Sequence, residues 1–217
     1  MSTPSASEAR PPRRERGQVR VAAIMEAGAA LFREKGFEAV TMSDIAARSG
    51  TAFGSLYRFF PSKEALADAL LVQYAERALD RLHDLAGKAV TMSPSDVAAA
   101  LVDFMLELKS ERSFAITVVE ARGADKDRRA KFRAAVRDRI ADVLRAALPR
   151  LTAADARATA IVTLHLLKGV AATGDEQPAV RRLLVVHYRE VLRSYLLAMH
   201  DESRAVTPPA LCADGEP

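Results

Sequence analysis

Cysteine is almost absent from this chain, which has one in 217 residues, and glycine and proline are sparse inside its longer segments. The single cysteine, Cys212, excludes an internal disulfide, supplies no zinc-binding set and suits a reducing cytoplasm. No apolar run approaches the roughly 18 residues of a membrane span, and none follows the early charges as in a signal peptide. These absences predict a cytoplasmic protein without a membrane segment.

The sequence also lacks the patterns of a catalytic or metal site. None of its four histidines stands at metal-ligand spacing from another histidine, a cysteine or a paired carboxylate. A helical enzyme or a metal-binding bundle would need inward Glu-x-x-His pairs, a nucleophile beside a base, or a phosphate loop. Because none of these patterns is present, we expect no catalytic activity, no metal and no cofactor.

Helix-forming residues make up most of what is present. Alanine, leucine, arginine and glutamate dominate, 49% of residues are hydrophobic, and no strand-like alternation persists, so we predict an all-α protein. Gly28, which costs about 1 kcal/mol against alanine in a helix, predicts close packing there. The ends, 1–14 and 201–217, are expected to be disordered. About nine helices are predicted, at 15–35, 41–49, 53–60, 63–85, 94–108, 111–121, 126–148, 153–172 and 179–200.

The stretch from Thr41 to Leu66 is the most informative part of the chain. Thr41 followed by Asp44 resembles a capping box, Gly50 suits a helix end, and a second short helix follows from about residue 53. Two such helices joined by a tight turn are too small to bury a core alone, and they fit the major groove of DNA. DNA binding is therefore the leading hypothesis.

Positive charge gathers near this stretch. Residues 1–66 carry ten Lys and Arg against seven Asp and Glu, whereas residues 67–217 carry 22 against 21. The segment 10–16, Arg-Pro-Pro-Arg-Arg-Glu-Arg, makes residues 1–14 a basic arm suited to following phosphates or entering a minor groove. The alternative is an N-terminus that is merely soluble and disordered.

The last two predicted helices are apolar on almost every side. A helix of this kind needs neighbours on both faces, and in a monomer the outer side of the pair would leave a large apolar patch in water. Homodimerisation through these helices is the favoured interpretation, and a core pair wrapped by the same chain is the alternative. The predicted interface residues are Ile161, Leu164, His165, Leu184, His187, Tyr188, Val191 and Tyr195.

Residues 21–66, interpreted as a first helix followed by a helix-turn-helix, resemble the TetR family of bacterial transcriptional regulators. The family pattern is an apolar first helix ending in Leu-Phe, then Gly-Phe, Thr, Ile-Ala, a turn glycine, Gly-x-Leu-Tyr and Ser-Lys-Glu-x-Leu. Beyond Leu66 only the length and the helix layout agree. The matching residues are Leu31-Phe32, Gly36-Phe37, Thr41, Ile45-Ala46, Gly50, Gly54-Ser55-Leu56-Tyr57 and Ser62-Lys63-Glu64-Ala65-Leu66.

The resemblance implies a three-helix DNA-binding head at 15–61, whose third helix enters the major groove. A ligand-binding and dimerisation body would follow at 62–200, with its last two helices paired across a two-fold axis. The implied function is that of a homodimeric repressor on a near-palindromic operator in double-stranded DNA, released by a small-molecule effector. A helical adaptor without DNA binding is the alternative.

The resemblance also implies roles for individual residues. Thr41, Tyr57 and Lys63 match positions that contact phosphates, and Gly54 matches one where the helix approaches DNA closely. Without the family motif, the alternative interpretation of Thr41 is an ordinary helix cap, and that of Lys63 is a solvated surface lysine.

Three departures from the family pattern affect base readout. The usual Val-Ser of the turn is Thr51-Ala52, which leaves Thr51 to supply the missing helix cap; Phe53 replaces a polar or basic residue, and Phe59 replaces a histidine. The common base readers Asn, Gln and Lys are therefore absent, and readout would use thymine methyls and hydroxyl bonds. Core packing is the alternative for Phe53. The candidate readers are Thr51, Phe53 and Ser55, with Arg58 directed to a phosphate or a base edge.

The body offers apolar and aromatic candidates for an effector pocket, each of which also reads as ordinary core. One acidic residue, Glu120, either faces a cationic ligand or pairs with an arginine at the surface. The candidates are Tyr74, Leu101, Phe104, Met105, Leu108, Phe114, Val118, Glu120 and His165.

Overall fold

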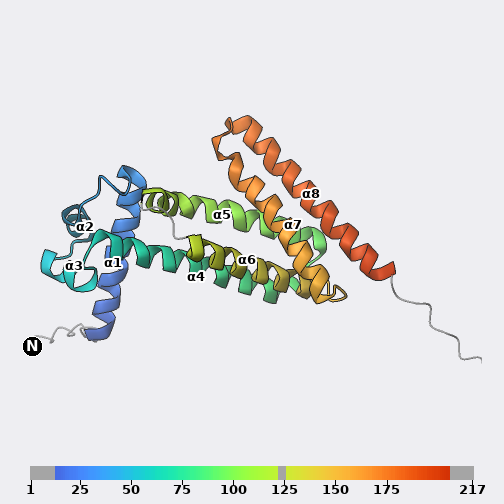
Figure 1. Cartoon of the computed structure of the whole chain (residues 1–217), viewed down its shortest axis with the longest axis horizontal. Helices are drawn as coiled ribbons and strands as arrows, with labels where there is room; N and C mark the ends of the chain where they lie inside the picture. Colours follow the sequence, from blue (N-terminus) through green and yellow to red (C-terminus); the bar gives the residue numbers. More distant parts are fainter. Residues whose placement is uncertain (1–12, 122–125, 206–217) are drawn as a thin grey trace, which may run out of the picture. The chain divides into compact units, whose positions relative to one another are not determined.

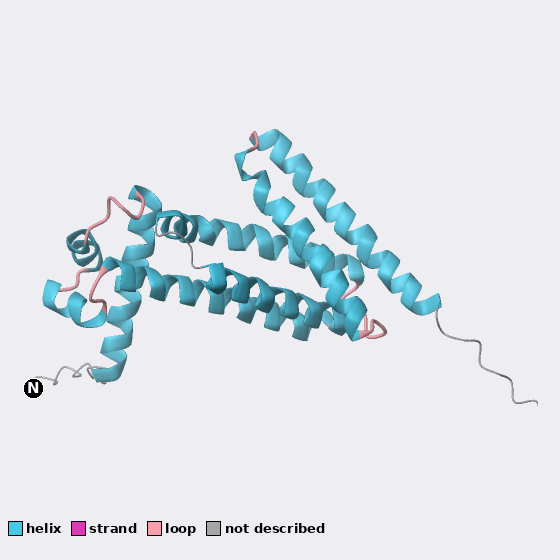
Figure 2. Cartoon of the chain, viewed as in Figure 1, coloured by secondary structure: helices cyan, strands magenta, loops and turns pink. Residues whose placement is uncertain are grey.

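The structure, a computed structural model, describes residues 13–121 and 126–205. Within these ranges the chain forms eight α-helices and one short 3-10 helix and contains no strand (Figures 1 and 2). None of the described helices is long and apolar enough to cross a membrane. The fold is all-α, as the sequence predicts. It divides into two compact units, Met1–Tyr74 with Arg112–Ala124, and Ala75–Glu111 with Asp125–Pro217.

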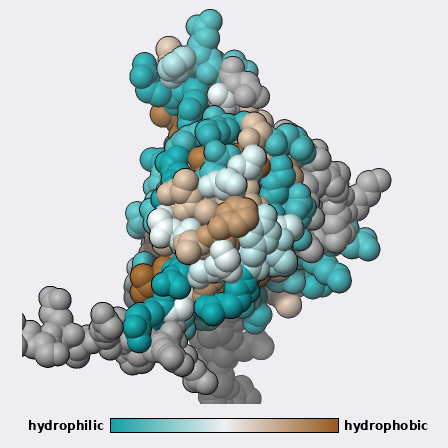
Figure 3. Space-filling view, turned by 90° about the vertical axis from the view of Figure 1, so that its left-hand side faces the viewer, coloured by the Kyte–Doolittle hydropathy of each residue, from teal (hydrophilic) through white to brown (hydrophobic). Residues whose placement is uncertain are grey.

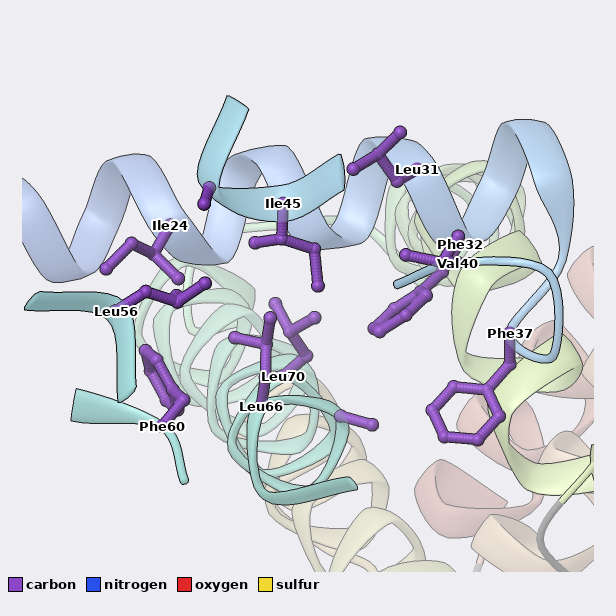
Figure 4. Close-up of a cluster of buried hydrophobic side chains, with 12 residues drawn as sticks. Ile24, Leu31, Phe32, Phe37, Val40, Ile45, Leu56, Phe60, Leu66 and Leu70 are labelled. Atoms are coloured by element: carbon purple, nitrogen blue, oxygen red, sulfur yellow. The ribbon is translucent and has the colours of Figure 1, made fainter. Parts of the chain in front are cut away.

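The first unit contains three helices and the start of a fourth: α1 (Arg13–Lys35), α2 (Met42–Ser49), α3 (Phe53–Phe59) and the part of α4 (Lys63–Ala89) up to Tyr74. Their apolar faces meet in one core, in which side chains from all four helices point toward one another (Figure 4). Burial of each large side chain contributes about 1.5–3 kcal/mol. The core includes Ile24, Leu31, Phe32, Phe37, Val40, Ile45, Leu56, Phe60, Leu66 and Leu70.

The close packing expected at Gly28 is confirmed. A Cβ placed on Gly28 would lie 2.7 Å from Cδ2 of Leu66, so α1 and α4 approach each other too closely there for a side chain. The missing side chain, which weakens α1 locally, is what lets α4 pack against it.

Local chemistry sets the ends of α2. Thr41 and Asp44 form the capping box at its start, as predicted, and Gly50 ends it in the left-handed conformation at φ 62°. Helix α3 begins without a side-chain cap at Ala52, as expected of an alanine. The Thr51 hydroxyl instead donates to the Ser49 carbonyl at 3.5 Å, so the prediction that Thr51 supplies the cap is wrong.

The second unit holds the rest of α4, α5 (Pro94–Ala121) up to Glu111, α6 (Lys126–Ala147), α7 (Ala153–Ala172) and α8 (Pro178–Ala205). A 3-10 helix, Thr173–Asp175, joins α7 to α8, which lie side by side (Figure 1). The prediction of separate helices at 94–108 and 111–121 is wrong. Residues 106–114 contain no glycine or proline, and their Leu, Glu, Lys and Arg residues continue a helix readily, so α5 runs unbroken.

Candidate nucleic-acid interface

The predicted DNA-binding residues all belong to the first unit, at the start of α2, in and just before α3, and at the start of α4. Thr51 is buried, with 8% of its surface exposed. Leu56 is fully buried and anchors α3 to the core, which leaves the opposite side of this seven-residue helix in solvent. In Figure 3, which shows the face on the α2 and α3 side of the molecule, pale and brown side chains gather at the centre with hydrophilic ones around them. The geometry therefore presents one exposed helix with a partly apolar surface.

Two aromatic rings form the exposed face of α3. Phe53 and Tyr57 are 50% and 41% exposed, and their ring centroids lie 4.8 Å apart at 60°. They stand one helical turn apart, which places both side chains on the same face. Phe53 is thus not part of the core, and the alternative reading of this residue as core is wrong.

Gly54 and Ser55 lie beside this aromatic pair. A Cβ on Gly54 would meet no atom of the chain within 4 Å, so packing within the chain does not require glycine there. The Ser55 hydroxyl accepts a hydrogen bond from Nη1 of Arg20 on α1 at 3.2 Å. This guanidinium is a basic group of the α3 surface that the sequence analysis missed, because a lone arginine in α1 carries no pattern that assigns it to α3.

The Thr41 hydroxyl is fully engaged within the capping box. Its Oγ1 donates to Oδ2 of Asp44 at 2.7 Å and accepts from the Asp44 backbone N–H at 3.1 Å. The Asp44 carboxylate accepts hydrogen bonds from the Thr41 hydroxyl and from the Thr41 backbone N–H, and these bonds, with Lys35 nearby, lower the pKa of that carboxyl. A phosphate contact through this hydroxyl requires its proton to turn away from Asp44.

Lys63 joins the start of α4 to the turn before α2. Its Nζ donates to the carbonyls of Phe37 and Glu38 at 3.0 and 3.1 Å and lies 4.6 Å from the centre of the Phe37 ring. One of its three N–H groups is left for another acceptor. Arg58 is exposed, with its guanidinium carbon 5.2 Å from the centre of the Phe59 ring.

An ion pair between helices stiffens the same unit. Arg48 at the end of α2 forms two hydrogen bonds with Glu34 near the end of α1. The hydrogen bonds from Arg48 lower the pKa of the Glu34 carboxyl. Both groups are exposed, so the pair orients α2 more than it stabilises the fold.

The pocket residues predicted in the body lie in different surroundings. Leu101, Phe104, Met105 and Leu108 are buried core, and Tyr74 is half-buried in the other unit. His165 is exposed and lines a cavity of about 220 Å³ between α6 and α7, which contains none of the other candidates. The side chains of Phe114, Val118 and Glu120 lie outside the described residues.

The predicted interface residues lie on α7 and α8, and their exposure varies. His165 and His187 are exposed, Leu184, Tyr188 and Tyr195 are half-buried, and Leu164 is buried at 7%. Other apolar residues of this pair stand further into solvent than several of those predicted. The exposed large apolar side chains of α7 and α8 are Ile161, Val162, Val180, Leu183, Val186 and Val191.

Among the described residues, no group of three or more His, Cys, Asp or Glu side chains is arranged to hold a metal ion. The exposed face of α3 presents two aromatic rings, a serine hydroxyl and guanidinium groups. These groups suit recognition of a nucleic acid.

Comparison with known proteins agrees with this geometry. Residues 24–70 match the family of bacterial regulatory proteins, tetR family. The HTH-type transcriptional repressor KstR2 of Mycobacterium tuberculosis is 40% identical over 62 residues, which cover 29% of this chain and 31% of that protein. The chain thus spans less than a third of the length of this relative.

Solved structures extend the likeness to the whole fold. A transcriptional regulator of Pseudomonas aeruginosa PAO1 aligns with a TM-score of 0.63 and 19% identity, covering 90% of this chain and 97% of that one. A regulator of Saccharomonospora viridis in complex with choline aligns with a TM-score of 0.60 and 22% identity, covering 82% and 95%. At these identities the structures establish the fold alone. The chain is thus similar to regulators of the TetR family in the sequence of residues 24–70 and in its fold.

Proposed function

We propose that this protein is a homodimeric transcriptional repressor that leaves its operator when a small molecule binds the body. The observation that carries the proposal is the exposed face of α3, where Phe53 and Tyr57 stand in solvent on a helix anchored through Leu56. Exposed rings on a short, firmly held helix are costly in water and useful against base edges.

On the proposed surface, readout and positioning are carried out by different groups. Phe53 meets a thymine methyl, and the Ser55 hydroxyl bonds a base edge while Arg20 holds it in place. Tyr57, Arg58 and the free N–H of Lys63 contact phosphates, which fix the register of the head without reading sequence. The basic arm at 1–14, of which residues 1–12 lie outside the described residues, adds charge near the phosphates.

Dimerisation is supported by the apolar surface of the C-terminal helix pair. Leu183 and Val186 are each 62% exposed on one helix, and Ile161 and Val162 add to this surface from its neighbour. A dimer that covers these side chains removes them from water and supplies the second head. Two heads related by a two-fold axis require a near-palindromic operator with half-sites about one helical turn apart or somewhat more.

Repression and effector release are proposed because one similar protein is a repressor and another was solved with a bound small molecule. KstR2 is described as a repressor, and the regulator of Saccharomonospora viridis was solved with a small molecule bound. Both properties are proposals for this chain, because one protein resembles it only in the head and the other only in fold.

Selection of bound duplexes from a random DNA pool tests the proposal. We expect enrichment of a near-palindromic site, with affinity that falls as salt rises because phosphate contacts release counterions. A reporter placed behind the selected site should be less active when the protein is present. A protein that binds no duplex at low salt would be a helical adaptor, and reporter activation would overturn the repressor assignment.

A further inference from the structure

A concave site lies in the second unit. The cavity of about 220 Å³ between α6 and α7 is lined by two arginines of α6 and by one face of α7. Residues spaced three or four positions apart on a helix share a face, so each helix presents a continuous wall. The side chains that matter for its chemistry are Arg133, Arg137, Ile161, Leu164, His165 and Lys168.

The charge around this cavity has one sign. Arg133, Arg137 and Lys168, which are cations at neutral pH, line it together with His165, and no carboxylate among the described residues does. None of the four forms an ion pair or hydrogen bond with another described residue. Other arginines of the same two helices do find partners, since Arg139 lies 3.5 Å from Asp142 and Arg157 lies 3.9 Å from Asp138.

Such a cluster is unfavourable without a counter-charge. Like charges one turn apart on a helix, as at Arg133 and Arg137, destabilise it by about 0.2–0.5 kcal/mol. An anion in the cavity converts that repulsion into attraction, and guanidinium groups bind the planar oxygens of carboxylates and phosphates through paired hydrogen bonds.

The volume of the cavity and its apolar lining limit which ligands it can bind. At about 220 Å³ it is smaller than the roughly 300–1,000 Å³ of sites for drug-sized molecules, so a small ligand fits. Ile161 and Leu164 give it an apolar side, which a bare inorganic ion would leave unused.

We propose that this cavity binds a small organic anion, with its carboxylate or phosphate group at Arg133 and Arg137 and a short apolar part on Ile161 and Leu164. The site shares no residue with the DNA-binding surface, and its occupation is measured without DNA. Ile161 and His165 are also expected at the dimer interface, so an acidic patch of a second copy is the competing occupant.

Isothermal titration calorimetry of the full-length protein tests the site. Hexanoate and phenyl phosphate are the organic probes, inorganic phosphate lacks the apolar part, and hexan-1-ol lacks the charge. We expect saturable binding of at least one organic anion, weaker binding of inorganic phosphate and none of hexan-1-ol. The order of the two organic anions distinguishes a carboxylate site from a phosphate site.

Variants locate the binding. The double change Arg133→Gln and Arg137→Gln should weaken organic-anion binding about tenfold or more, because a charge-assisted hydrogen bond is worth that much. Arg145→Gln, an exposed arginine of the same helix outside the cavity, is the matched control and should bind as the wild type does. Lys168→Gln provides the same comparison from α7 if the double variant loses helical circular dichroism.

Two results would overturn the proposal. One is the absence of saturable binding by either organic anion, or equal binding by the wild type and the charge variants. The other is a double variant whose sedimentation mass changes while its anion binding does not, which would assign the cluster to contact with a second copy. Failure of DNA binding, by contrast, has no bearing on these measurements.

Discussion

Phe53 and Tyr57 stand half in solvent on a helix whose other face is buried. Burial of a phenylalanine side chain is worth about 1.5–3 kcal/mol, so leaving the ring in water forgoes stability in the free protein. That exposure is consistent with a surface kept for a partner. At this scale the chemistry of single side chains decides what α3 can read and what the rest of the head holds in place.

Phe53→Ala should remove discrimination at one thymine in each half-site, by roughly 1 kcal/mol or more, because the ring's favoured contact is the C5-methyl group. Affinity for non-specific duplex should change little. Fluorescence anisotropy with thymine replaced by uracil measures this: the wild type should lose affinity and the variant should not respond. A variant that melts earlier and binds every sequence more weakly would show that the ring is structural.

Lys63→Ala should act in two ways. Loss of two hydrogen bonds to the Phe37 and Glu38 carbonyls should lower the free energy of unfolding by about 1 kcal/mol. If its remaining N–H meets a phosphate, the salt dependence of DNA binding should also flatten by about one unit of slope. Chemical denaturation and salt titration separate the two effects, and an unchanged slope would leave Lys63 a purely structural role.

The ends and the crossings of helices matter at the scale of elements. Both ends of helix α2 are capped by residues close to it in the chain. Helices α7 and α8, by contrast, pack together where Gly169 of α7 lies beside Tyr188 of α8, and these residues are far apart in sequence. Short helices depend on their caps because few internal hydrogen bonds hold them. Long helices depend on the surfaces that pack against each other.

Thr41→Ala should destabilise the head by about 1 kcal/mol, since it removes the hydroxyl that caps α2.

The lowered pKa of Asp44 means that the folded state favours its ionised form. This contribution is present above the ordinary pKa of an aspartate and is lost as pH falls through the lower pKa of the folded state. Thermal melts at acidic and neutral pH should therefore differ less for Asp44→Asn than for the wild type. An equal difference would show that other groups, such as Glu34, dominate the acid response.

Gly169→Ala should weaken the packing of α8 on α7. A Cβ there would lie 2.4–2.6 Å from three atoms of the Tyr188 side chain. Overpacking costs roughly 1–3 kcal/mol, and alanine returns about 1 kcal/mol of helix propensity. Gly87→Ala is the matched control, because a Cβ there meets nothing within 4 Å and should stabilise α4. Urea denaturation compares the two, and equal gains would mean that Tyr188 moves aside at no cost.

The exposed apolar surface of α7 and α8 belongs to the scale of the whole molecule. Six large apolar side chains on two neighbouring helices are at least 36% exposed. Exposed apolar side chains that lie together often mark an interaction surface. The proposed dimer, formed through them, would have two DNA-binding heads, and so would connect the C-terminal helices to the symmetry of the operator.

Leu183→Glu and Val186→Glu should each convert the dimer into monomers or aggregates, because a dimer would have to bury the new charge in its interface. Sedimentation of the wild type at micromolar concentration should give twice the chain mass of 23.5 kDa. Val90→Glu, at a residue that is 69% exposed at the turn after α4, is the control and should remain dimeric. A stable monomeric wild type would refute the dimer.

The sequence by itself determined most of the local structure. The capping pair Thr41 and Asp44 and the left-handed Gly50 predict α2 to within a residue, since their hydrogen bonds and backbone angle involve only neighbours in the chain. Family spacing over the head predicted the fold and the candidate face of α3. Where no strong local signal exists, as near Glu111 in α5, the predicted boundary was wrong.

Only the tertiary structure decided which distant groups meet. The Arg20–Ser55 bond, the attachment of Lys63 to the turn before α2 and the contact of Tyr188 with Gly169 join residues 19 to 35 positions apart. It also left Leu183 in solvent where the sequence pointed to Leu184, and brought Arg133, Arg137 and Lys168 around one cavity. These features depend on how helices rotate and cross, which is set by the packing of whole faces and not by the residues that border each position.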